Sequence, residues 1–144
     1  MSEAKQFGCV AIGGCGVLID GVPSAGKSSL ALALIDRGAM LVGDDGVILE
    51  TRGGGLIAAP HPRIAGKLEV RNVGLVDFPV SVPVPVALVL RLDDEAPRFI
   101  DVAERVEVLG VDLPLVRLWP GGTMLALRAE LALRKYGKTF GAFS

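Results

Sequence analysis

The chain has 144 residues, a formal net charge of −1 and 51% apolar residues, with few aromatic side chains. This length suits a single domain over residues 1–144, which can bury roughly two-thirds of its unfolded surface without cross-links. The charges are balanced and the sequence has no Lys/Arg cluster, which argues against nucleic-acid binding. The longest apolar stretch, residues 80–90, is broken by Pro83 and Pro85 and is too short to cross a membrane.

The N-terminus and the cysteines favour a cytoplasmic location. Residues 1–6 are polar and lack the apolar core of a secretory signal peptide. Cys9 and Cys15 are the only cysteines, and His61 is the only histidine that could join them around a metal. We therefore expect two free thiols, and neither a disulfide framework nor a zinc site is predicted.

The first third of the chain predicts two strands and a helix around a glycine-rich loop. Residues 10–12 and 16–19 are short apolar runs separated by a Gly-Gly turn. Residues 28–37 predict a helix that is apolar on more than one face, as expected for a helix packed against a sheet. Gly38 follows directly and is expected to provide a left-handed C-terminal cap.

Short strands dominate the rest of the chain. They are predicted over residues 40–42, 47–50, 56–59, 68–71, 86–92, 106–111 and 115–118. A last helix is expected between a Thr123 cap and a Gly137 stop, with Met124, Leu127 and Leu131 facing inward. Its expected outer side carries four charged residues, Arg128, Glu130, Arg134 and Lys135. Helices near both ends of a strand-rich middle predict an α/β domain with a mixed sheet and flanking helices.

The glycine-rich loop carries the clearest functional signal, because it matches the phosphate-binding pattern G-x-x-x-x-G-K-[ST] between an apolar strand and an apolar helix. Its glycines let successive N–H groups point at one anion, and the following helix adds its positive N-terminal end. Lys27 is expected to reach the β- and γ-phosphates, and the Ser28 hydroxyl to bind Mg²⁺. The residues expected to hold the nucleoside triphosphate are Gly21, Val22, Pro23, Ser24, Ala25, Gly26, Lys27, Ser28 and Ser29.

Two adjacent aspartates, Asp44 and Asp45, follow the short strand at residues 40–42. Asp-Asp-Gly is a good turn sequence, so a solvated turn is one interpretation. Beside a phosphate loop, one carboxylate can position a metal ion or its water, and the other can accept the proton of an attacking hydroxyl. We favour the functional interpretation because the phosphate loop is present.

Two blocks of sequence resemble the catalytic domain of HPr kinase/phosphorylase. In the first, Asp45 lies eighteen residues beyond Lys27, after a helix and a short strand, which is closer than the metal-binding aspartate of most P-loop enzymes. In the second, residues 68–75 are similar to the family signature Glu-[Ile/Val]-Arg-Gly-[Leu/Val]-Gly, with Asn72 in place of a glycine. A weaker similarity over residues 106–122 extends the resemblance to most of the chain.

The resemblance implies a serine/threonine protein kinase of the phosphotransferase system. It implies ATP and Mg²⁺ as cofactors, HPr or an HPr-like phosphocarrier as substrate, a fold like that of phosphoenolpyruvate carboxykinase, and a homo-oligomer, often a hexamer. By position, Asp45 matches the family's proton acceptor, Lys27 its phosphate-binding lysine, and Ser28 and Glu69 its magnesium ligands. Arg98 matches a catalytic arginine through a looser alignment. Without the signature, Glu69 would be interpreted as one partner of a surface ion pair.

The chain also departs from the family pattern. Gln6 stands where the family has a histidine, and Pro-Gly-Gly at residues 120–122 replaces a Pro-Gly-Arg loop linked to the reverse reaction. The second departure argues against phosphorylase activity. Two alternatives to a protein kinase remain: a nucleotide-binding regulator with weak or no catalysis that signals through a partner protein, and a small-molecule kinase.

Overall fold

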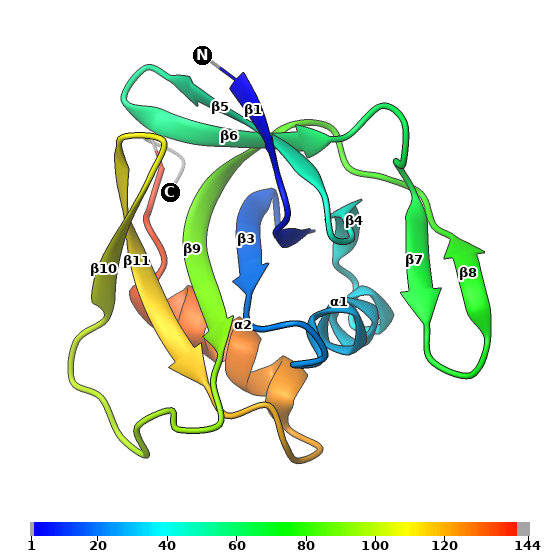
Figure 1. Cartoon of the computed structure of the whole chain (residues 1–144). Coiled ribbons are helices and arrows are strands. Elements are labelled where there is room, and N and C mark those ends of the chain that lie inside the picture. The colour runs from blue at the N-terminus through cyan, green and yellow to red at the C-terminus, as the bar shows by residue number, and fades with distance from the viewer. Residues whose placement is uncertain (1, 141–144) are drawn as a thin grey trace.

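The computed structural model describes residues 2–140, over which the chain forms eleven strands and two helices (Figure 1). The helices are α1 (Lys27–Asp36) and α2 (Leu125–Tyr136). The strands are β1 (Ser2–Lys5), β2 (Gly8–Ile12), β3 (Cys15–Asp20), β4 (Met40–Gly43), β5 (Val47–Arg52), β6 (Gly55–Pro60), β7 (Lys67–Val70), β8 (Gly74–Asp77), β9 (Val84–Leu92), β10 (Glu104–Val108) and β11 (Val111–Leu118). None of these helices is long and apolar enough to cross a membrane.

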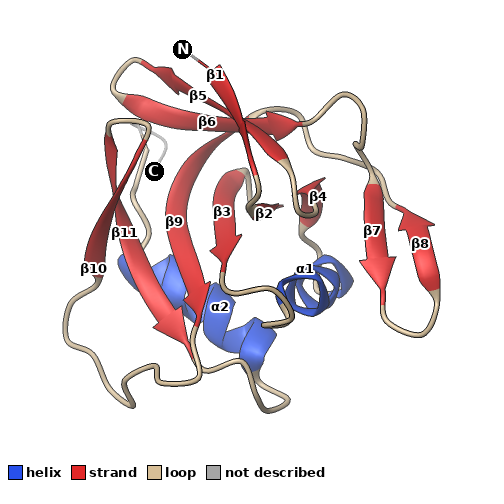
Figure 2. Ribbon diagram, in the orientation of Figure 1, coloured by secondary structure: helices blue, strands red, loops and turns tan. Residues whose placement is uncertain are grey.

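Nine strands form one mixed sheet in the order β1-β5-β6-β9-β3-β2-β4, with β11 also pairing with β9 and β10 pairing with β11. The long strand β9 runs parallel to β3 and β11 and antiparallel to β6. Strands β7 and β8 form a separate hairpin beside α1 (Figure 2). The predicted α/β domain with a mixed sheet is therefore confirmed.

Two apolar cores lie on opposite faces of the central strands. Successive residues alternate between the cores: Ile19 contributes to one and Leu18 to the other. The first core includes the buried faces of α1 and α2, and the second is covered by strands β5, β6, β10 and β11 of the curled sheet. Because both faces are covered, β3 and β9 read as continuous apolar runs in the sequence.

Helix α1 matches its prediction to within one residue. Gly26 precedes it with a φ of 104°, a left-handed conformation that favours glycine. At its end, Gly38 has a φ of 109°, and the Ala39 N–H donates to the Leu34 carbonyl oxygen at 3.0 Å. The predicted left-handed glycine cap is therefore present.

The predicted details of helix α2 were wrong in two respects. The helix begins at Leu125 after Met124, with no side-chain cap, so Thr123 does not cap it. Its buried face consists of Ala126, Ala129 and Ala132, whereas Met124 and Leu131 are 60% and 44% exposed. Small side chains let this helix lie close to β9 and β11, and the larger leucine is left outside.

A strand predicted over residues 106–111 is instead the end of one strand, a tight turn and the start of another. Leu109 and Gly110 have φ values of 49° and 79°, which form the two-residue turn of the β10–β11 hairpin. The sequence did not predict the turn, because Leu109 is apolar and a non-glycine residue rarely adopts a positive φ. Strands β1 and β8 were not predicted.

Candidate active site

The phosphate loop connects the end of β3 to the start of α1. Gly21, Ser24 and Gly26 all have positive φ values, of 154°, 66° and 104°, so the backbone bends repeatedly before the helix begins. The Lys27 Nζ donates a hydrogen bond across the loop to the Gly21 carbonyl oxygen at 3.0 Å. The loop therefore places a lysine ammonium and a helix N-terminus together, an arrangement suited to binding phosphate.

Asp44 connects three elements at this site. The Ser28 hydroxyl, at the start of α1, donates to Asp44 Oδ1 at 2.7 Å. The Glu69 backbone N–H, on β7, donates to Asp44 Oδ2 at 3.1 Å. These bonds hold the Asp44 carboxylate beside the Ser28 hydroxyl, which is the hydroxyl expected to bind metal.

Asp45 is exposed and has a φ of 59°, an uncommon conformation for a residue other than glycine. The turn before β5 is tight, since a Cβ at Gly43 would overlap the Gly46 carbonyl oxygen. Backbone strain of this kind often accompanies functional sites. The turn separates two chemically identical neighbours, because Asp44 is hydrogen-bonded to Ser28 and Glu69 while Asp45 is exposed and lines the cleft beside the phosphate loop.

The hairpin formed by β7 and β8 borders the same site. Leu68 anchors it in the first core with no exposed surface, and Asn72 lies in its turn with a φ of 70°. Asparagine tolerates this left-handed conformation better than most residues. The substitution of Asn72 for the signature glycine therefore keeps the turn geometry.

Two clefts flank the phosphate loop. The larger, of about 1100 Å³, is lined by Lys27, Ser28, Asp44, Asp45 and Glu69, together with Gln6, Asp20, Gly21, Pro23, Ser24, Gly26, Ser29 and residues 70–74. The smaller, of about 740 Å³, contains the remaining loop residues Val22 and Ala25 with residues 91–95 and Pro120. Arg98 lines neither cleft and instead lines a third cavity beside α2.

A comparison with protein families matches residues 2–81 to the HPr Serine kinase C-terminal domain. This segment includes the phosphate loop, both aspartates and the signature hairpin, and it covers more than half of the chain. The chain belongs to the HPr serine kinase C-terminal domain family.

Relatives extend the similarity beyond this segment. The HPr kinase/phosphorylase of Chlorobaculum tepidum is 34% identical over 90% of this chain and 43% of its own length. That of Prosthecochloris aestuarii is 30% identical over 99% of this chain and 47% of its own length. The chain thus spans less than half the length of these two family members.

A solved structure of the Hpr(Ser) kinase/phosphatase from Coxiella burnetii superposes with a TM-score of 0.82 and 29% identity. The match covers 92% of this chain and 88% of the other. Because the match covers 92% of the chain, it extends well beyond residue 81, where the family-model match ends, and it supports a shared kinase fold over nearly the whole chain.

Sequence reasoning missed two features of this family member's site. It did not assign Asp44 to Ser28, because the bond joins residues sixteen positions apart through a tertiary contact. It also did not identify the ion pair between Arg91 and Asp20, whose side-chain atoms lie 2.8 Å apart at the ends of β9 and β3. The parallel pairing of two apolar strands ending in opposite charges was the available signal.

Proposed function

We propose that this protein is an ATP-dependent kinase that phosphorylates a serine of HPr or an HPr-like phosphocarrier. The observation that carries the proposal is the single cleft that joins a phosphate loop to Asp44, Asp45 and Glu69. Membership of the HPr serine kinase family and the names of the relatives point to the same reaction.

In the proposed mechanism, the loop N–H groups and Lys27 bind the triphosphate and offset negative charge on the transferred phosphoryl group. Asp45 accepts the proton of the substrate serine hydroxyl while the serine oxygen attacks the γ-phosphorus and ADP leaves. Asp45 suits this role because it is exposed in the cleft and has no hydrogen-bond partner among the described side chains. Arg98 lies in a different cavity, so we assign it no step.

The residues present fit a magnesium ion bound together with substrate phosphates. No group of three or more His, Cys, Asp or Glu that could hold a metal occurs among the described residues. Mg²⁺ beside a nucleotide usually needs only one or two protein carboxylates, because phosphate and water oxygens supply the other ligands. Ser28, Asp44 and Glu69 provide these oxygens, and the bound ion would neutralise charge on the β- and γ-phosphates.

The test is transfer of radiolabelled phosphate from ATP to a purified HPr-like carrier, beside an Asp45→Asn variant. We expect label on a carrier serine and its loss in the variant, because Asn cannot accept the proton. Retained ATP binding without label on any carrier would contradict the kinase and leave the nucleotide-binding regulator. Label on a metabolite and not on protein would indicate a small-molecule kinase.

A further inference from the structure

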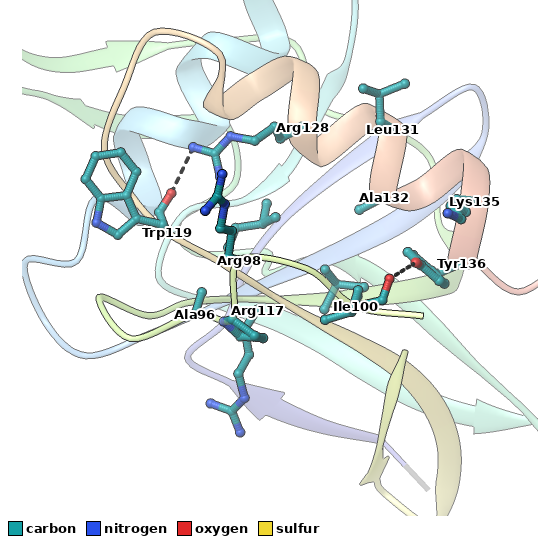
Figure 3. A pocket seen from close by; sticks show the side chains of 13 residues that line it. Ala96, Arg98, Ile100, Arg117, Trp119, Arg128, Leu131, Ala132, Lys135 and Tyr136 are labelled. Atoms are coloured by element: carbon teal, nitrogen blue, oxygen red, sulfur yellow. Dashed lines mark hydrogen bonds between the residues drawn. The ribbon is translucent and has the colours of Figure 1, made fainter. Parts of the chain in front are cut away.

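A cavity of about 470 Å³ lies between α2, the end of β11 and the loop at residues 96–100 (Figure 3). It shares no lining residue with either cleft beside the phosphate loop. Its volume falls in the range of ordinary small-molecule sites. The proposed kinase reaction assigns it no role.

The cavity has an apolar wall formed from two sides. Helix α2 contributes three apolar or aromatic residues on one face, Leu131, Ala132 and Tyr136, between the cations Arg128 and Lys135. The opposite side adds four apolar side chains, Ile100, Val116, Leu118 and Trp119. Trp119 is 52% exposed and Leu131 44% exposed, which is high for large apolar side chains. Apolar surface is therefore available to a ligand here.

Positive charge in the cavity is not balanced. Its lining contains four cations, Arg98, Arg117, Arg128 and Lys135, and no carboxylate. Only Arg117 is paired with acids, since it contacts Asp93 at 2.9 Å and Glu104 at 2.8 Å, and its guanidinium points away from the other two arginines in Figure 3.

The other three cations have no acidic partner among the described residues. Arg128 donates to the carbonyl oxygens of Trp119 at 3.0 Å and Gly121 at 2.9 Å, and Lys135 lies 5.4 Å from the Tyr136 ring centre. Figure 3 shows the guanidinium groups of Arg98 and Arg128 pointing toward one another. Like charges that converge beside apolar surface favour an anion between them.

We propose that this cavity binds a small amphipathic anion, a molecule with a carboxylate or phosphate head and an aromatic or branched apolar body. The head meets the guanidinium groups of Arg98 and Arg128, and the body packs on Trp119 and Leu131, while Lys135 adds positive charge at the other end of the cavity beside Tyr136. The apolar surface and the positive charge both contribute to selectivity. An acid without an apolar body leaves the apolar surface exposed to water, and a protonated amine is repelled by the cations of the lining.

Trp119 allows a direct test, because it is the only tryptophan of the chain. The full chain is titrated with 4-phenylbutyrate, with 4-phenylbutyl phosphate and with 4-phenylbutylamine, and binding is followed by tryptophan fluorescence and calorimetry. We expect saturable binding of one or both acids at least roughly tenfold tighter than of the amine. The comparison of the two acids identifies the preferred head, and acetate and inorganic phosphate should not bind in the same range.

Matched variants locate the site. Arg98→Gln should weaken binding of the acid roughly five- to tenfold by removing a charged donor to the head. Lys135→Gln lowers the positive charge at the far end of the cavity and should weaken binding less. Arg134→Gln is the control, since it removes a cation of α2 that does not line the cavity. Arg128 is left intact because its bonds hold the chain at residues 119–121, and circular dichroism confirms that each variant is folded.

Three results would overturn the proposal: no saturable binding of either acid by both methods, equal binding of the amine, or equal weakening by Arg134→Gln. Sedimentation velocity tests whether a second copy of the chain occupies the cavity instead. Self-association that Leu131→Asp abolishes would make the cavity a subunit interface and would also contradict a small-molecule site.

Discussion

Asp44 and Asp45 are adjacent and chemically identical, yet the structure places them in different environments. Asp44 accepts hydrogen bonds from the Ser28 hydroxyl and the Glu69 N–H, while Asp45 lies exposed after a left-handed turn. Two neighbouring carboxylates can perform different tasks when their surroundings differ. We therefore propose that Asp44 positions the metal ion and that Asp45 accepts the proton.

Asp44→Asn tests the first assignment. Asparagine can keep the bond from Ser28 but carries no charge, so we expect a normal fold and at least a roughly hundredfold loss of phosphotransfer. The ATP dissociation constant, measured with and without Mg²⁺, should lose most of its dependence on the ion. Asp101→Asn, in an exposed loop outside both clefts, is the control. A variant that keeps the full Mg²⁺ dependence would rule out the role.

Asn72 supports a second prediction at this scale. Its φ of 70° is strained for most side chains, so Asn72→Ala should destabilise the protein by about 1 kcal/mol, while Asn72→Gly should be close to neutral. Urea unfolding measures both, with the exposed neighbour Val73→Ala as control. Equal stability of the alanine and glycine variants would show that the turn relaxes.

The phosphate-loop pattern singled out Lys27 and Ser28, and the resemblance singled out Asp45 and Glu69. The structure brings these four residues to one cleft, while their roles remain predictions. The hydrogen bond between Asp44 and Ser28 could not be predicted from the sequence, because it depends on how β4 and α1 pack against each other. Arg98 shows the opposite difficulty, since a loose alignment cannot say which cavity a loop residue faces.

At the scale of elements, α2 shows why apolar periodicity alone can mislead. The sequence offered two faces, one with leucines and one with alanines, and the structure buries the alanines. Burial of the larger side chains is the usual preference, but close approach to a sheet favours small ones. Burial of the alanine face leaves Leu131 exposed, where it lines the cavity between α2, β11 and the loop at residues 96–100.

Ala129→Leu tests this close approach. Ala129 has no exposed surface, so a larger side chain should overpack the first core and cost about 1–3 kcal/mol of unfolding free energy. Leu131→Ala should change stability by less than about 0.5 kcal/mol, because Leu131 lies outside the core. Chemical denaturation of both variants provides the comparison. A tolerated leucine at position 129 would mean that α2 packs loosely.

The two helices are joined by a charged contact that gives a pH-dependent prediction. Arg37 donates to both carboxylate oxygens of Glu130, at 2.9 and 2.8 Å, and this contact lowers the pKa of Glu130 below its ordinary value of 4.5. A carboxyl group with a lowered folded-state pKa stabilises the protein above its unfolded-state pKa and loses that contribution as the pH falls. Glu130→Gln should therefore destabilise the protein at neutral pH.

The difference between the wild type and Glu130→Gln should shrink as the pH falls below 4.5 and through the lowered pKa of Glu130. Urea midpoints at neutral and acid pH measure it. Glu107→Gln, on the exposed strand β10, is the control and should show little pH-dependent difference. A difference between wild type and Glu130→Gln that is constant with pH would exclude the ion pair as its source.

At the scale of the whole molecule, the sheet brings together ends of strands that are distant in the sequence. Parallel pairing of β3 with β9 places the phosphate loop beside residues 91–95, and β4 adds the two aspartates. The sequence predicted an α/β class from its apolar strands and terminal helices. It could not predict this strand order, because pairing between strands that are distant in the sequence depends on how the whole chain packs and not on the local sequence pattern.

Nucleotide binding should stabilise the entire domain, because the loop, α1, β4 and β7 form the cleft only when folded. A ligand at one hundred times its dissociation constant adds about 2.7 kcal/mol, which raises the melting temperature of a domain of this size by roughly 5–10 °C. Thermal unfolding with increasing ATP and Mg²⁺ measures the shift. Lys27→Ala should remove most of it, whereas Lys67→Ala, on β7 outside both clefts, should keep it. A rise in melting temperature that persists in Lys27→Ala would show that the nucleotide binds outside the phosphate loop. A normal rise in the wild type without phosphotransfer to a carrier would indicate a domain that binds nucleotide but does not catalyse.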